Sequence, residues 1–95
     1  MTEYKVNLKN IKTIHELHKE LKDSLNFPDH YGENMDALWD CITCDIETPA
    51  TIMIEGITSL PNDLENEKNL LIGILSDAVE WYKNADKILK VVYLD

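Results

Sequence analysis

The sequence predicts an α/β fold in which a small three-stranded parallel sheet packs with three to four helices, in the order β-α-α-β-(α)-α-β. Polar and apolar residues alternate near the N-terminus, two later runs are short, apolar and rich in β-branched residues, and the intervening segments repeat apolar residues at helical intervals. A chain of 95 residues with 44% hydrophobic content suffices for one core. We therefore expect a single domain over residues 1–95.

The first part of the chain is predicted to form a strand and a helix. Residues 3–8 alternate between polar and apolar side chains, which is typical of a strand with one covered face. Thr13 precedes Glu16 by the spacing of a reciprocal capping box, and leucines then recur at helical intervals. This pattern predicts the first helix over residues 14–25.

A loop and a second helix come next. Residues 26–33 include Pro28 and Gly32, so we expect a turn-rich loop. Asn34 is placed to cap the second helix, and the helical region ends at Pro49. The apolar stripe expected on this helix consists of Met35, Leu38, Trp39 and Ile42.

The rest of the chain completes the predicted sheet. Residues 50–55 form a short apolar run of the kind buried in a parallel sheet, and residues 57–61 are a connector or a brief helical turn. Apolar spacing over residues 70–81 predicts a long amphipathic helix. Residues 88–94 form the final strand, which a right-handed crossover would lay parallel to its neighbour.

Charge is unevenly distributed along this acidic chain. It carries 18 acidic and 9 basic residues, a formal net charge of -9. Between Asp23 and Glu67 there are eleven acids and no lysine or arginine. Interspersed charge would serve solubility, whereas a long block of one sign creates a field that steers an oppositely charged partner. We expect a basic protein partner, with no direct binding to nucleic acid or to a membrane.

Two cysteines and three histidines are candidates for chemical reactivity or metal binding. Cys41 and Cys44 form a C-x-x-C near the end of the predicted second helix, where acidic neighbours raise a thiol pKa, so a structural role is favoured over redox or metal chemistry. His15, His18 and His30 form no paired metal motif, and the first two are expected to be solvated on their helix. We therefore expect no catalytic residues, no metal and no cofactor.

The cellular location is predicted from what the sequence lacks. It has no leader of basic and apolar residues, and no apolar run near the roughly 20 residues that a membrane span needs. Because only two cysteines are present, a disulfide framework is not indicated. We expect a cytoplasmic protein that is a monomer when free.

Asp36 and Asp40 lie four residues apart, and so stack on one face of the second helix with Thr43 beside them. Paired carboxylates can perform acid-base chemistry, but here no apolar pocket or metal partner is evident. A solvated helix face remains open. The residue types modestly favour accepting charge-assisted hydrogen bonds from arginine or lysine.

Residues 31–41, YGENMDALWDC, resemble the signature of the barstar family of intracellular inhibitors of barnase-type ribonucleases. The resemblance implies an inhibitor, not an enzyme, whose second helix and preceding loop enter the active-site cleft of a basic ribonuclease or nuclease toxin. It implies that Asp40 is the central anchor, Asp36 its neighbour and Asp77 a peripheral contact. The expected partner-binding residues are His30, Gly32, Asn34, Met35, Asp36, Trp39, Asp40, Thr43, Cys44, Asp45 and Asp77.

Three of these positions depart from the family pattern. His30 stands where the family often has tyrosine, and Cys44 and Asp45 replace a small residue and an aromatic one. Fewer aromatic anchors and one added charge leave two partners open, barnase itself and a different basic nuclease or toxin. The alternatives are an acidic adaptor or nucleic-acid mimic that binds another basic protein, and a thiol enzyme that uses the two cysteines.

Overall fold

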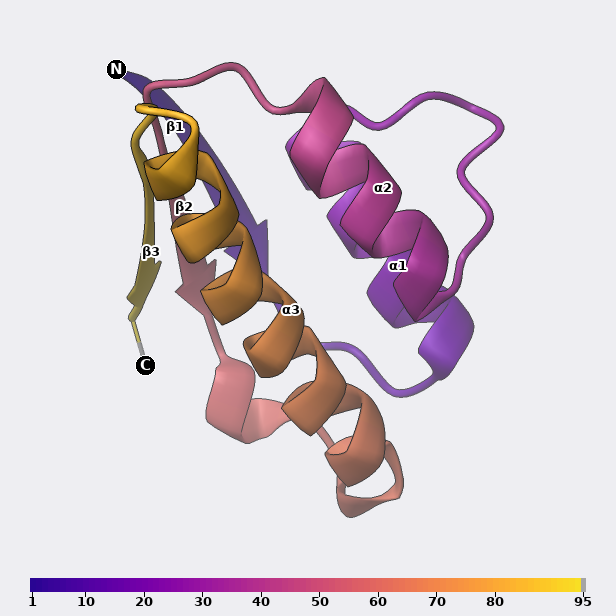
Figure 1. The fold of residues 1–95 in the computed structure, drawn as a ribbon. Coiled ribbons are helices and arrows are strands. Elements are labelled where there is room, and N and C mark those ends of the chain that lie inside the picture. Colours follow the sequence, from indigo (N-terminus) through magenta and orange to yellow (C-terminus); the bar gives the residue numbers. More distant parts are fainter. Residues whose placement is uncertain (95) are drawn as a thin grey trace.

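The computed structural model describes residues 1–94, and it places the helices together on one face of a three-stranded sheet (Figure 1). The sheet is parallel with the order β1-β2-β3, so β2 is central. The predicted α/β class and element order are confirmed, and the additional helical segments are two short 3-10 turns. The elements are β1 (Thr2–Asn7), α1 (Ile14–Leu25), α2 (Met35–Asp45), β2 (Ala50–Glu55), η1 (Ile57–Ser59), η2 (Asn62–Leu64), α3 (Glu65–Asn84) and β3 (Leu89–Tyr93).

The core lies between the sheet and the helices. Tyr4 of β1 pairs with Ile52 of β2, which in turn pairs with Val91 of β3, so alternate side chains form rows on the helix side. The opposite face of the sheet has no helix over it (Figure 1). The largest fully buried aliphatic side chains are Leu8, Leu17, Leu21, Leu25, Leu38, Ile42, Ile52, Ile54, Leu71 and Leu75.

The first helix begins at the capping box that the sequence predicts. The Thr13 hydroxyl accepts from the Glu16 N–H at 3.1 Å, and the Glu16 carboxylate accepts from the Thr13 N–H at 3.2 Å. The helix ends at Asn26, whose φ of 57° lies in the left-handed region and whose N–H donates to the Lys22 carbonyl. These two local signals account for the confirmed boundaries of α1.

The connection from β2 contains the predicted brief helical turn as η1, but α3 begins earlier than predicted. Gly56 has a φ of 83°, and a Cβ there would lie 2.9 Å from the Lys9 backbone nitrogen, so this tight turn requires glycine. The chain then forms η1 and η2, and α3 begins at Glu65 instead of residue 70. The first turn of α3 follows η2 directly, and the buried Leu64 side chain anchors this junction to the core. None of the helices in residues 1–94 is long and apolar enough to cross a membrane.

Helix α3 is attached to α2 through aromatic side chains. The buried Tyr82 hydroxyl donates to the Ile42 carbonyl oxygen at 2.6 Å. The rings of Trp39 and Trp81 meet edge to face with centroids 6.5 Å apart. These contacts determine which surfaces of the two helices lie next to each other.

Replacing Tyr82 by phenylalanine should lower the free energy of unfolding by about 1–2 kcal/mol, because the buried Ile42 carbonyl loses its hydroxyl donor. Urea denaturation followed by circular dichroism measures this change. Tyr93→Phe is the matched control, since the Tyr93 side chain is 41% exposed. Equal stability of the two variants would contradict the role assigned to the Tyr82 hydroxyl.

Candidate functional site

A groove of about 480 Å³ lies at the surface between α2 and α3. It brings Asp77 of α3 to the same hollow as Asp36 and Asp40 of α2, although the sequence separates them widely. The expectation that no apolar pocket adjoins the two α2 carboxylates is therefore wrong. The groove is lined by Met35, Asp36, Trp39, Asp40, Leu70, Ile74 and Asp77.

The three carboxylates of the groove are available to a partner. Asp36, Asp40 and Asp77 are exposed, and none of them forms an ion pair within residues 1–94. Carboxylates on an apolar floor suit arginine or lysine, because the charged head can hydrogen-bond while the aliphatic stem packs below it. The geometry therefore supports binding of a basic side chain.

The apolar floor of the groove consists of Met35, Trp39, Leu70 and Ile74. Leu70 and Trp81 belong to the apolar spacing that predicted this helix, yet they are 45% and 43% exposed, and Trp81 packs against Trp39 of the groove. Ile74, which lines the groove, is half-buried. Helical spacing in the sequence could have revealed this surface. Residues 70, 74 and 81 are each separated from their neighbours in this series by three or four positions when Asp77 is included, so they lie on the same side of α3 as Asp77.

The loop before α2 is attached to the start of that helix. The Asn34 side chain caps α2 by accepting from the Ala37 N–H at 2.8 Å, and its amide donates to the Gly32 carbonyl at 3.3 Å. A Cβ at Gly32 would lie 3.3 Å from the Ala37 Cβ, so a larger residue would crowd this contact. Asn34 and Gly32 thus shape the loop next to Asp36.

The same loop is attached to α1 through side-chain contacts. The Tyr31 hydroxyl lies 2.7 Å from His18 Nδ1, and the Tyr31 ring packs against Phe27 with centroids 5.1 Å apart. His15 Nδ1 lies 2.6 Å from a Glu33 carboxylate oxygen at the surface. The prediction that His18 is solvated is wrong, because it is only 2% exposed and pairs with Tyr31. His15 is exposed as predicted.

The remaining predicted contact positions lie outside the groove. His30 is exposed in the loop, while Cys44 and Asp45 are exposed in the last turn of α2. Thr43 is half-buried, and its hydroxyl donates to the Trp39 carbonyl at 2.9 Å. Because Cys44 follows Asp40 by four residues, it continues the same side of the helix.

The two cysteines have different environments, and both are free. Cys41 is buried, as predicted for a core residue, whereas Cys44 is exposed. Burial raises the pKa of the Cys41 thiol to about 11, and a hydrogen bond to Asp45 contributes. A protonated thiol is a weak nucleophile. No cluster of three or more His, Cys, Asp or Glu side chains in the described residues could hold a metal ion.

Comparison with known proteins finds similarity that covers most of the chain. A family model described as "Barstar (barnase inhibitor)" matches residues 1–94. A Bacillus subtilis (strain 168) protein named "Putative ribonuclease inhibitor YrdF" is 35% identical over 81 residues, which are 85% of this chain and 89% of that protein.

The buried histidine below the loop predicts a pH-dependent stability. Burial lowers the pKa of His18 from its ordinary value of 6.5, although Glu33 and Glu67 partly offset the effect. The unfolded chain therefore binds more protons than the folded one below that value. Stability from neutral His18 is fully present above pH 6.5, and it should fall as the pH drops through 6.5 toward the lower folded pKa.

Urea denaturation between pH 7.5 and pH 5.5 measures this loss, over a range where carboxylates remain largely ionised. The control is His30→Gln, which removes an exposed histidine and should leave the decline unchanged. An NMR titration of the His18 ring that gives a pKa at or above the ordinary value would contradict the explanation.

Proposed function

The chain belongs to the barstar family, and we propose that it inhibits a basic barnase-type ribonuclease, or a related nuclease toxin, by binding in the active-site cleft. The family model and the matched Bacillus subtilis protein both carry ribonuclease inhibition in their names. The observation that carries the binding mode is the groove in which Asp36, Asp40 and Asp77 converge on an apolar floor.

Inhibition by this surface needs no chemistry in the inhibitor. A ribonuclease cleft must attract the phosphates of RNA, and arginine, lysine and histidine side chains provide that attraction. Carboxylates of the inhibitor compete for the same donors, with Asp40 as the central anchor and Asp36 one helical turn earlier. Asp77 extends the contact from α3, because the groove places it beside the α2 acids.

The proposed interface extends from the groove in both directions along α2. It includes the loop before the helix and the exposed part of its last turn, and it has a standard total buried area of about 1,600 Å². The proposed contact residues are His30, Gly32, Asn34, Met35, Asp36, Trp39, Asp40, Thr43, Cys44, Asp45 and Asp77.

The ends of this surface determine which nuclease is bound. His30 and Cys44 are exposed at opposite ends of it, and neither is a phenylalanine, tyrosine, tryptophan or acid. Asp45 adds a carboxylate near the Cys44 end. We infer a partner with an extra basic group facing Asp45 and little apolar surface facing His30, and therefore an enzyme that differs from barnase.

The free protein is proposed to be a cytoplasmic monomer. Both cysteines are free thiols, which fits a reducing compartment. The formal net charge of -9 opposes association of two identical copies.

Asp40→Asn should weaken inhibition of the cognate ribonuclease by at least about 30-fold, the loss expected when a central contact worth about 2 kcal/mol is removed. The amide keeps the shape of the side chain but loses the charge. Inhibition constants from an RNA-cleavage assay, with the nuclease captured from cell extract on the immobilised chain, measure the effect.

The matched control for this change is Asp63→Asn, which neutralises an exposed acid in η2, outside the groove. It should leave the inhibition constant within about twofold, because a surface charge distant from an interface contributes little. Unchanged inhibition by folded Asp40→Asn would exclude the proposed mechanism. Capture of a basic protein with no nuclease activity would favour the acidic adaptor instead.

The association rate should depend strongly on ionic strength. A block of acids without a base from Asp23 to Glu67 attracts a basic cleft at long range, and salt screens this attraction beyond about 8 Å at 0.15 M. Raising the salt from 0.05 M to 0.5 M should slow association more than it speeds dissociation. Stopped-flow fluorescence measures both rates, and a salt-independent association rate would contradict electrostatic steering.

A further inference from the structure

The outer edge of β3 has no strand beside it. Within residues 1–94 the sheet ends at β3, which pairs only with β2. The Ala50 N–H donates to the Ile88 carbonyl and the Leu94 N–H donates to the Ile54 carbonyl. Parallel pairing alternates along a strand, so the even-numbered residues of β3 bond to β2. The backbone N–H and C=O groups of the odd-numbered ones (Leu89, Val91 and Tyr93) therefore point to the open side.

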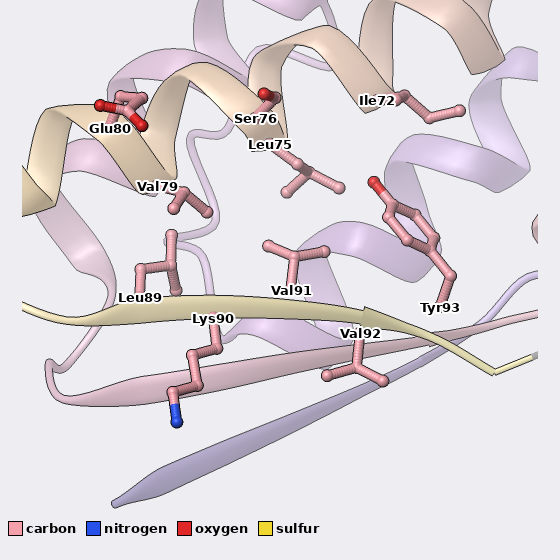
Figure 2. Close-up of a pocket in the computed structure, with 10 residues that line it drawn as sticks. All are labelled: Ile72, Leu75, Ser76, Val79, Glu80, Leu89, Lys90, Val91, Val92 and Tyr93. Carbon is pink, nitrogen blue, oxygen red and sulfur yellow. The ribbon is translucent and has the colours of Figure 1, made fainter.

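An apolar groove of about 630 Å³ runs along this edge, between β3 and α3. In Figure 2 the side chains of Leu89, Val91 and Tyr93 point toward α3, where Leu75 and Val79 face them. Alternate side chains of a strand point to opposite faces, so every second residue of a strand added at β3 would lie over this groove.

The other face of β3 is basic and partly apolar. Figure 2 shows Lys90 and Val92 pointing away from α3, and Val92 is 39% exposed. At the beginning of the strand, on the side of α3, Lys83 and Lys87 lie with the 53% exposed Ile88 beside Val79 and Leu89. None of these three lysines forms an ion pair in the described part of the chain. The edge thus combines apolar surface with free positive charge on a strongly acidic protein.

We propose that the β3 edge binds an extended acidic segment of a partner protein, which adds to the sheet as a fourth strand. Apolar residues of the segment occupy the groove below α3, and the acidic residues alternating with them face Lys90. Glu80 stands on the helix side of the groove (Figure 2), which keeps carboxylates of the segment on the opposite face.

The charges favour this occupant over a second copy of the chain. Two copies would each bring a formal net charge of -9, and β3 contains no acid that could face the Lys90 of a second β3. An acidic segment, in contrast, would neutralise lysines that have no intramolecular partner. This site uses a different side of α3 from the acidic groove, so it does not depend on the proposed inhibition.

The first test uses a nine-residue peptide with capped termini in which valine and glutamate alternate. A second peptide, in which lysine replaces glutamate, is the control for charge. Titration into the isotopically labelled chain should shift the amide NMR signals of Leu89, Val91 and Tyr93 with the glutamate peptide only. Val91→Pro should abolish binding, because it removes an outward N–H that β2 does not use. Circular dichroism checks that this variant is folded.

A second set of variants tests the charge argument without altering the strand edge. Replacing Lys83, Lys87 and Lys90 together by glutamine should weaken binding of the glutamate peptide about tenfold, because Lys90 loses its direct ion pair and the edge loses two further positive charges nearby. The matched control replaces by glutamine Lys12, Lys19 and Lys22, which lie in or just before α1, so the net charge changes equally and binding should be preserved.

Several results would overturn the proposal. These are equal binding of the lysine peptide, no binding of the glutamate peptide to the folded chain, and peptide-induced shifts confined to the groove between α2 and α3. Dimerisation through β3, seen by sedimentation and abolished by Val91→Pro, would assign the edge to a second copy. Ribonuclease inhibition should be unaffected by Val91→Pro, which keeps this test separate from that of the proposed function.

Discussion

The hydrogen bond from the Tyr82 hydroxyl to the Ile42 carbonyl joins the two helices that form the acidic groove, and the proposed binding surface depends on it. The last four carbonyls of a helix have no partner within it, and Ile42 is the first of these in α2. The chain turns to an extended conformation at Ile46, and the last turn of α2 has no basic residue to satisfy these groups. Tyr82 of α3 therefore completes the end of α2, and this contact places Asp77 across from the α2 acids.

Local signals in the sequence predicted much of the fold. The capping box of Thr13 and Glu16 gave the start of α1, and Asn34 gave the start of α2. The apolar run at residues 50–55 gave β2 with its observed bounds. In each case, side chains that are neighbours in sequence contain the information. The start of α3 was missed because Leu64 is ordered by packing against the core, which leaves no capping pattern in the sequence.

The candidate site was only partly accessible from the sequence. Helical spacing brought Asp36 and Asp40 together, but Asp77 was connected to them only through the family resemblance. The hollow between them could not be predicted, because it arises where two helices distant in sequence pack against each other. The burial of His18 was missed for the same reason, since the Tyr31 hydroxyl that satisfies its ring nitrogen comes from a loop that folds back over α1.

Core residues and exposed residues of α2 and its preceding loop are different, and this separation has an evolutionary consequence. Leu38 and Ile42 serve the core, so substitutions there cost stability. His30 and Cys44 are exposed at the two ends of the proposed interface, and neither is part of that core. Mutations at these ends can therefore accumulate with little effect on folding. Under the proposed function they would alter which nuclease is recognised, so a lineage could follow a changing target by substitutions at the margins and retain the carboxylates at the centre.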